Sequence, residues 1–128
     1  MKKKMIIIGG GISGIYLSIL LKKYLDMDVV VLEANDKPLK KLLATGNGRC
    51  NLSNKDLDKA HYDGDIKPWV NDIIHDFDIV EALKDIGLYT KYMGNLLYPY
   101  SESAKAVQTL FLNRAEEYGV KIICDEEV

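Results

Sequence analysis

Three consecutive glycines between two short, β-branched runs constrain the fold of this chain more than any other feature. The first run begins at Met5 and ends at Ile8, and the second covers residues 29–33. Short apolar runs bounded by glycine are typical of strands buried on both faces of a parallel sheet. Residues 12–25 repeat apolar side chains at helical spacing, with Ile12, Ile15, Ile19, Tyr16 and Leu20 expected toward the sheet. The sequence therefore predicts two parallel strands joined by a crossing helix.

The glycines fit the pattern G-x-G-x-x-G at Gly9, Gly11 and Gly14. In a strand-turn-helix setting these positions give a tight turn, room for a pyrophosphate against bare backbone, and close packing of helix on strand. The helix start directs free N–H groups and its positive dipole end at the phosphates. Ser13 lies in this first turn. Two interpretations remain open: its backbone N–H contacts a phosphate, or serine is present only because a small residue is tolerated at a helix start.

Glu33 ends the second run, nineteen residues after Gly14. A carboxylate at that place accepts hydrogen bonds from a ribose diol and repels a 2′-phosphate. The combination predicts a dinucleotide site and favours FAD or NAD over NADP.

Composition excludes several other classes. The chain has 128 residues, 48% of them apolar, which suffices for one globular domain with a core. A formal charge of −2 gives no electrostatic case for nucleic acid. Two cysteines more than seventy residues apart suggest a reduced, cytoplasmic setting without a disulfide scaffold.

Neither a membrane segment nor a metal site is expected. The basic start and the apolar run up to Leu21 resemble a signal peptide, but three glycines interrupt the run and no small-residue cleavage site follows. The aspartates at 56, 58, 63 and 65 lack the closing glutamate of an EF-hand, so a polar loop or brief helix is expected for residues 55–67. His61 and His75 are too isolated to share a metal.

A second glycine-rich run, Thr45-Gly-Asn-Gly-Arg-Cys-Asn51, suits a backbone wrapped around an anion, with a guanidinium available. A structural ion pair with an aspartate or glutamate is the alternative explanation for Arg49. Lys37 and Lys40 are interpreted as a solvated face. Cys50 lacks a nearby partner cysteine, which favours a small, partly buried side chain over a redox thiol.

The rest of the chain predicts further regular elements. Pro68 starts a helix with Trp69, and Asp78 caps another over residues 79–86 that Gly87 ends. Residues 88–100 predict a tyrosine-rich hairpin, in which cross-strand packing is a commoner use than base stacking. Ser101 or Ser103 opens a helix that ends at Gly119, and residues 120–124 predict a third parallel strand.

In three places the sequence resembles the HI0933-like (BaiN-type) flavoproteins, FAD-dependent oxidoreductases of the two-dinucleotide-fold group. They are the first glycine fingerprint with Glu33, the run from Lys41 to Asn51, and Tyr98-Pro-Tyr-Ser101 before a helix. Of the three, the run from Lys41 to Asn51 is specific to this family, whereas many nucleotide-binding proteins share the first pattern. Such proteins are roughly three times longer, so residues 1–128 look like the N-terminal portion of their FAD-binding domain, without a second domain.

The resemblance implies roles for single residues. Gly9, Gly11 and Gly14 would hold the FAD pyrophosphate, Glu33 the adenosine ribose, and Val128 the adenine through its backbone. The positions that would line the cofactor toward the flavin are Lys41, Thr45, Gly46, Gly48, Arg49, Cys50 and Asn51. Leu39 stands where glycine is expected and Asn47 interrupts a usual glycine triplet, so a different backbone path is expected there.

The fold class expected is therefore α/β: a Rossmann-like FAD/NAD(P)-binding fold with a parallel sheet and a β-hairpin, incomplete relative to the full family. The expected function is the FAD-binding portion of a flavin-dependent oxidoreductase, with NAD(P)H as a candidate electron donor and no general acid or base evident. The alternatives are an NAD-binding dehydrogenase fragment and a truncated, non-catalytic module that no longer retains nucleotide. The first strand would keep an unpaired edge, through which the chain is expected to self-associate.

Overall fold

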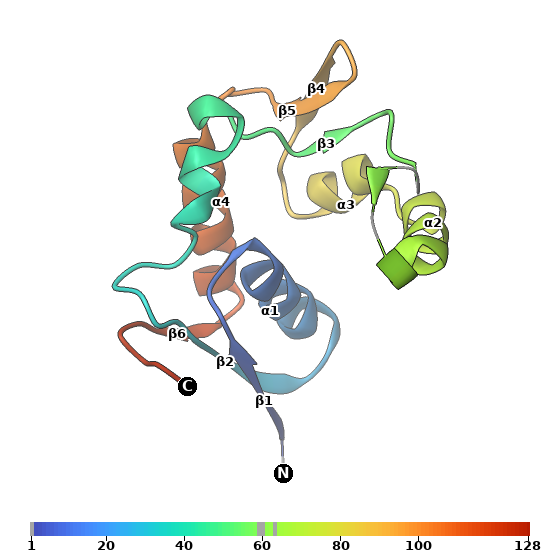
Figure 1. Ribbon diagram of the computed structural model, residues 1–128. Helices are drawn as coiled ribbons and strands as arrows, with labels where there is room; N and C mark the ends of the chain where they lie inside the picture. Colours follow the sequence, from blue (N-terminus) through green and yellow to red (C-terminus); the bar gives the residue numbers. More distant parts are fainter. Residues whose placement is uncertain (1, 59–60, 63) are drawn as a thin grey trace. The chain divides into compact units, whose positions relative to one another are not determined.

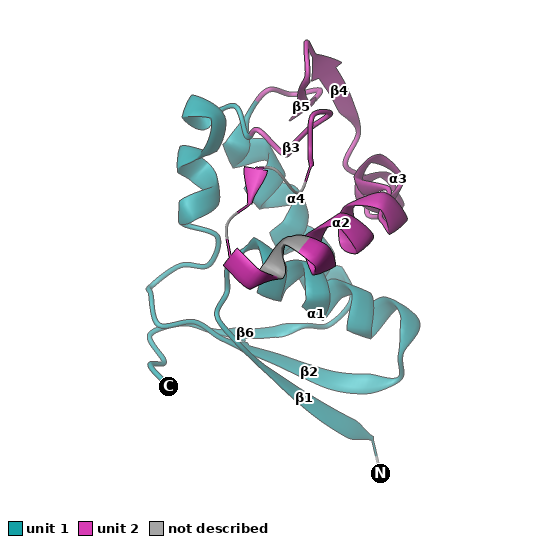
Figure 2. Cartoon of the chain, turned by 45° about the vertical axis from the view of Figure 1, so that its right-hand side comes forward, with its two compact units in different colours: residues 1–50, 103–128 teal, residues 51–102 magenta. Residues whose placement is uncertain are grey.

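The computed structural model describes residues 2–58, 61–62 and 64–128 (Figure 1). The chain divides into two compact units, coloured separately in Figure 2. Unit 1 comprises residues 1–50 and 103–128, and unit 2 comprises residues 51–102. Asp63, one acid of the expected polar loop, lies outside the described residues.

Unit 1 contains a parallel three-stranded sheet in the order β1-β2-β6. The strands are β1 (Lys3–Ile8), β2 (Met27–Leu32) and β6 (Lys121–Ile123), and α1 (Ile12–Tyr24) crosses from β1 to β2. Ile7 pairs with Val31, which pairs in turn with Ile122 on β6. The predicted β-α-β unit and the third parallel strand are confirmed, and the fold is of the Rossmann type.

The core of unit 1 lies between α1 and the sheet. Ile15 and Ile19 of α1 are fully buried, as are Val29 and Val31 on the facing side of β2. Tyr16 meets Phe111 of α4 (Ala104–Glu117) edge-on, with ring centroids 6.2 Å apart. Tyr16 therefore packs against the neighbouring helix α4. Apolar periodicity within α1 does not show which neighbouring element such a side chain contacts.

The expectation that residues 5–8 are buried on both faces is wrong. Ile7 is buried, but Ile6 is 63% exposed and Ile8 68% exposed. Side chains alternate along a strand, so Ile6 and Ile8 share the face opposite α1, which no described element of unit 1 covers (Figure 2). β1 is also an edge strand of this sheet.

Helix α4 returns the chain to the sheet. Its N-cap is Ser103, whose hydroxyl oxygen accepts a hydrogen bond from the Ala106 N–H at 3.2 Å. Gly119 follows with a φ of +73°, as expected after a helix that glycine ends.

Unit 2 carries an antiparallel sheet in the order β3-β5-β4. The strands are β3 (Ser53–Asn54), β4 (Thr90–Met93) and β5 (Leu96–Pro99), and Gly94 turns between the last two with a φ of +61°. The predicted hairpin is confirmed, and Leu97, Tyr98 and Pro99 of β5 are buried.

The helices of unit 2 also follow their sequence signals. Within its described residues they include the single turn η3 (Gly64–Ile66), α2 (Lys67–Asp76) and α3 (Ile79–Asp85). Asp78 caps α3 by accepting from the Glu81 N–H at 3.1 Å, and Gly87 follows with a φ of +88°. Over the described part of the chain, no helix has the length and apolar character needed to cross a membrane.

Candidate nucleotide site

The turn after β1 brings strand and helix very close together. Gly9 has a φ of +101°, and its N–H donates to the Leu32 carbonyl oxygen at 2.7 Å. A Cβ at Gly14 would collide with the Gly9 carbonyl oxygen, so position 14 admits only glycine without a shift of the backbone. A Cβ at Gly11 would meet no atom within 4 Å. The turn is therefore open to a ligand at Gly11, in its middle, whereas Gly9 and Gly14 at its two ends are tightly constrained.

A pocket of about 370 Å³ lies over this open backbone and is formed entirely within unit 1. Its wall combines the glycine turn, the start of α1, the end of β2 and the segment that follows β2. The lining residues are Gly10, Gly11, Ile12, Glu33, Asn35, Lys37, Leu39, Lys40, Lys41, Leu42 and Thr45.

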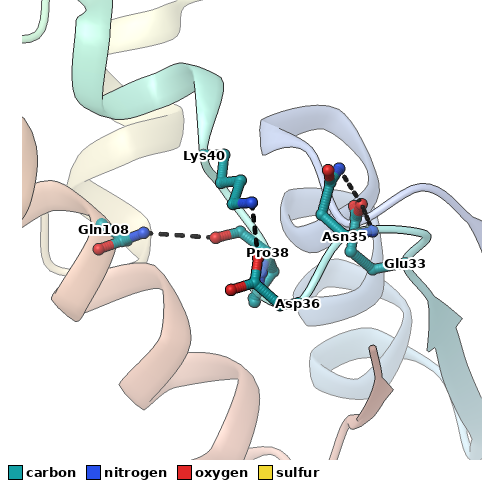
Figure 3. Close-up of polar contacts among 6 residues, drawn as sticks. All are labelled: Glu33, Asn35, Asp36, Pro38, Lys40 and Gln108. Atoms are coloured by element: carbon teal, nitrogen blue, oxygen red, sulfur yellow. Dashed lines mark hydrogen bonds and ion pairs between the residues drawn. The ribbon is translucent and has the colours of Figure 1, made fainter. Parts of the chain in front are cut away.

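Glu33 is the acid of this pocket and its side chain is held rigidly. It is only 8% exposed, although it directly follows β2. Its Oε2 accepts from the Gly10 N–H at 2.7 Å. Its Oε1 accepts from the Asn35 N–H at 2.8 Å and from Asn35 Nδ2 at 2.6 Å (Figure 3). The bonds from Asn35, with a smaller contribution from Gly10, lower the pKa of Glu33 below its ordinary value despite burial. The carboxylate is therefore ionised at neutral pH and fixed in direction.

Three lysines edge the pocket around this acid. Lys37, Lys40 and Lys41 are exposed, and all three are among the lining residues. Lys40 Nζ lies 2.5 Å from Asp36 Oδ1, an ion pair drawn in Figure 3. Lys37 and Lys40 thus form the solvated face expected from the sequence and also border the pocket.

Leu39 takes the backbone conformation that a glycine would take. Its φ is +61° and its side chain is 2% exposed. Its N–H donates to the Gly10 carbonyl oxygen at 2.8 Å. The expected departure at position 39 is thus a leucine in a left-handed conformation, whose strain is opposed by burial of the side chain.

The second glycine-rich run reaches the pocket only at its beginning. Its first four residues belong to η1 (Lys41–Gly48), a 3-10 helix interrupted at Thr45, Gly46 and Asn47. Lys41 and Thr45 line the pocket, and Thr45 Oγ1 donates to the Leu42 carbonyl oxygen at 2.6 Å. Other expected site residues are not among its lining: Gly9, Ser13, Gly14, Gly46, Gly48, Arg49, Cys50, Asn51 and Val128.

These remaining positions have different surroundings. Asn51 belongs to unit 2, whereas Val128 is exposed near the end of unit 1. Cys50 is fully buried with a φ of +63°, and burial raises the pKa of its thiol. That environment suits a small packed side chain rather than a reactive thiolate.

Sequence reasoning overlooked Gly10, Ile12, Asn35, Leu39 and Leu42 of the pocket wall. Asn35 carried a usable signal, because an amide two residues after a strand-ending acid can hydrogen-bond that acid through a tight turn. Leu39 carried a signal for an unusual backbone, because it stands where the resembled family has glycine, but none for the pocket. Leu42 carried none, since an apolar residue there indicates packing. Among the residues that the structure describes, no group of three or more His, Cys, Asp or Glu side chains could hold a metal ion.

Two solved structures share the fold at low sequence identity. THI4 of Thermovibrio ammonificans superposes with a TM-score of 0.61 at 16% identity, covering 96% of this chain and 37% of that one. The tetrameric form of 2-methyl-3-hydroxypyridine-5-carboxylic acid oxygenase gives a TM-score of 0.50 at 18% identity, covering 98% and 32%. At such identities the likeness concerns the fold alone.

Two curated relatives are closer in sequence. The 3-dehydro-bile acid delta(4,6)-reductase of Clostridium scindens is 38% identical over 120 residues, which are 91% of this chain and 29% of the relative. The ribosomal RNA dihydrouridine synthase of Haemophilus influenzae is 30% identical over 128 residues, which are 96% of this chain and 31% of the relative. The chain thus spans about three tenths of the length of these relatives. Residues 3–128 match the HI0933-like protein Rossmann domain, and the chain belongs to that family.

Proposed function

We propose that unit 1 binds the adenosine diphosphate half of FAD and is the cofactor-binding part of a flavin-dependent oxidoreductase. The observation that carries the proposal is the buried, ionised Glu33 facing a pocket whose floor is open backbone at Gly11.

The carboxylate supports a ribose ligand. An ionised carboxylate offers about four acceptor positions. The N–H of Gly10 and two donors of Asn35 occupy three of them. One position remains for a ribose hydroxyl, and rotation of the Asn35 side chain frees a second. The negative charge disfavours a phosphorylated ribose, which favours FAD or NAD over NADP.

The adjoining backbone supports the diphosphate. Gly11 is the N-cap of α1 and brings no side chain to that end of the helix. Gly11 and Ile12, at the start of this thirteen-residue helix, belong to the pocket lining. The first N–H groups and the positive dipole end of the helix are therefore directed toward the pocket. Lys41, another lining residue, supplies a positive charge. Gly9 and Gly14 support this geometry from outside the lining, and Ser13 belongs to the same helical turn.

Bound FAD would supply hydride transfer through its isoalloxazine ring. The names of both curated relatives describe the addition of hydrogen to a double bond, in a bile acid and in a uridine. We therefore propose reduction of a carbon–carbon double bond as the reaction of the whole enzyme, with NAD(P)H as electron donor. The pocket residues bind and orient the cofactor, and none is assigned a proton-transfer role.

We do not extend the nucleic-acid substrate of the second relative to this chain. Unit 2 bears the exposed hairpin tyrosines, yet it contains five lysines against ten aspartates and glutamates. Such a surface repels a phosphate backbone.

Titration of the purified chain with FAD, followed by flavin fluorescence, tests the cofactor. We expect binding to the chain to quench the flavin fluorescence of FAD saturably. NAD should compete with FAD more weakly. Tighter binding of NAD than of FAD would favour the dehydrogenase alternative. Absence of binding at high micromolar FAD would favour a module that does not retain nucleotide.

We also propose that β1 pairs with a strand of a second copy of the chain. β1 is an edge strand, and Ile6 and Ile8 expose their side chains beside that edge. Light scattering should then report a dimer, and Ile6→Lys should shift it toward monomer. A clean monomer with slow amide exchange throughout residues 5–8 would contradict the pairing.

A further inference from the structure

A buried carboxamide on α4 contacts the segment that walls the nucleotide site. Gln108 is 5% exposed, and its Nε2 donates to the Pro38 carbonyl oxygen at 3.3 Å across seventy residues of sequence (Figure 3). Its Oε1 accepts from Lys105 Nζ at 2.8 Å. A lysine only donates and a carbonyl only accepts, so these two partners fix the orientation of the carboxamide.

The Pro38–Leu39 peptide is held at both ends. Gln108 holds its carbonyl oxygen, and the Leu39 N–H of the same planar group donates to the Gly10 carbonyl oxygen at 2.8 Å. The Gly10 N–H in turn donates to Glu33 Oε2 at 2.7 Å. A continuous series of hydrogen bonds therefore runs from α4 through the pocket wall to the acid of the site.

This hold opposes a local strain. Leu39 has a φ of +61°, a left-handed conformation that is strained for a residue with a Cβ. Turning the Pro38–Leu39 peptide by half a rotation would bring Leu39 to a φ of about −120°, in the broad allowed β region. The same rotation would direct the carbonyl away from Gln108 and the N–H away from Gly10. Gln108 thus opposes a rearrangement that the leucine favours.

We propose that Gln108 is a positioning residue of the nucleotide site: it fixes the Pro38–Leu39 peptide and, through Gly10, the Glu33 carboxylate in the orientation that receives the ribose. Only the identity of the ligand rests on the proposed function. The hydrogen-bonded series concerns this chain's own residues and can be measured without ligand.

The test compares Gln108→Met with Thr109→Ala in the 128-residue chain. Methionine matches the length of glutamine without its hydrogen bonds, and Thr109 is an exposed neighbour whose hydroxyl bonds within α4. We expect Gln108→Met to speed amide exchange at Leu39 and Gly10 and to raise the Kd for FAD about tenfold, a change of about 1.4 kcal/mol. Thr109→Ala should change neither. Gln108→Glu, which keeps an acceptor for Lys105 but cannot donate to Pro38, should reproduce the loss if the methionine variant fails to fold.

A second arm separates positioning from a general loss of structure. Glycine accepts a positive φ without strain, so in a Leu39→Gly background Gln108→Met should raise the Kd for FAD less than about twofold. An equal loss in both backgrounds, or unchanged exchange at Leu39 and Gly10 in Gln108→Met, would overturn the proposal. If the wild-type chain does not bind FAD, the proposed function fails, whereas the exchange measurement still decides whether Gln108 holds the peptide.

Discussion

The two glycine-rich stretches of this chain look equivalent in sequence and differ in structure. The turn after β1 is closed by hydrogen bonds to β2 and to the segment after it, and it forms the floor of the pocket. The run from Thr45 to Asn51 contributes only its first residue to the pocket wall. Glycine content therefore marks an unusual backbone in both stretches, whereas a pocket with a buried, hydrogen-bonded carboxylate accompanies only the first of them.

The largest effect is expected where the first turn is tightest. Gly14→Ala should reduce the free energy of unfolding by roughly 3 kcal/mol, because its Cβ meets the Gly9 carbonyl oxygen. Gly11→Ala is the matched control, since its Cβ meets no atom within 4 Å. Urea unfolding should show that the control retains its stability. Equal stability of the two variants would mean that helix and strand are not in close contact at Gly14.

Glu33→Arg should weaken FAD binding by about 1–3 kcal/mol, because it removes the charged acceptor of the ribose hydroxyls. Arg49→Gln supplies a charge-changing control in the second glycine-rich run, outside the pocket lining. Fluorescence titration of both variants measures the difference. Unchanged affinity in Glu33→Arg would show that the acid does not face the nucleotide.

Acidification should remove the stabilising contribution of the Glu33 carboxylate. Its pKa is lowered in the folded chain, chiefly by the donors of Asn35, so its contribution is complete above the unfolded value of about 4.3. That contribution is lost as the pH falls through the lower, folded pKa. Urea unfolding of wild type and Glu33→Gln should therefore differ at neutral pH, and the difference should shrink as the pH falls from the unfolded value of about 4.3 through the lower, folded pKa. A difference that grows on acidification would reverse the assigned direction of the pKa.

The smallest effect is expected in the second glycine-rich run. Asn47 is exposed with a φ of +54°, and glycine adopts this conformation without strain. Since the relief of strain is offset by the greater freedom of glycine in the unfolded chain, Asn47→Gly should change stability by less than about 0.5 kcal/mol. FAD affinity should also be unchanged. A large loss of affinity would assign this run a direct role that the pocket does not indicate.

Local signals predicted most of the elements correctly. The glycine turn, the valines of β2 and the N-caps Asp78 and Ser103 act within a few residues of the structures they specify. The position of Glu33 in the pocket also followed from its place at the end of a strand.

Long-range features were not available from local patterns. Exposure of Ile6 and Ile8 depends on what covers the far face of a sheet, which alternation along one strand does not reveal. The hydrogen bond from Gln108 to Pro38 joins residues seventy positions apart. The left-handed backbone of Leu39 depends on its hydrogen bond to Gly10 and on burial of its side chain. A glutamine on the buried face of an amphipathic helix is a weak signal by itself.

Amide chemical-shift mapping with FAD tests the proposed nucleotide site most directly. Added to the isotopically labelled chain, FAD should shift the amide resonances of Gly10, Gly11, Ile12 and Asn35 together and saturably, with unit 2 much less affected. Shifts confined to other residues, with these four unchanged at saturation, would contradict binding of the nucleotide at the turn after β1.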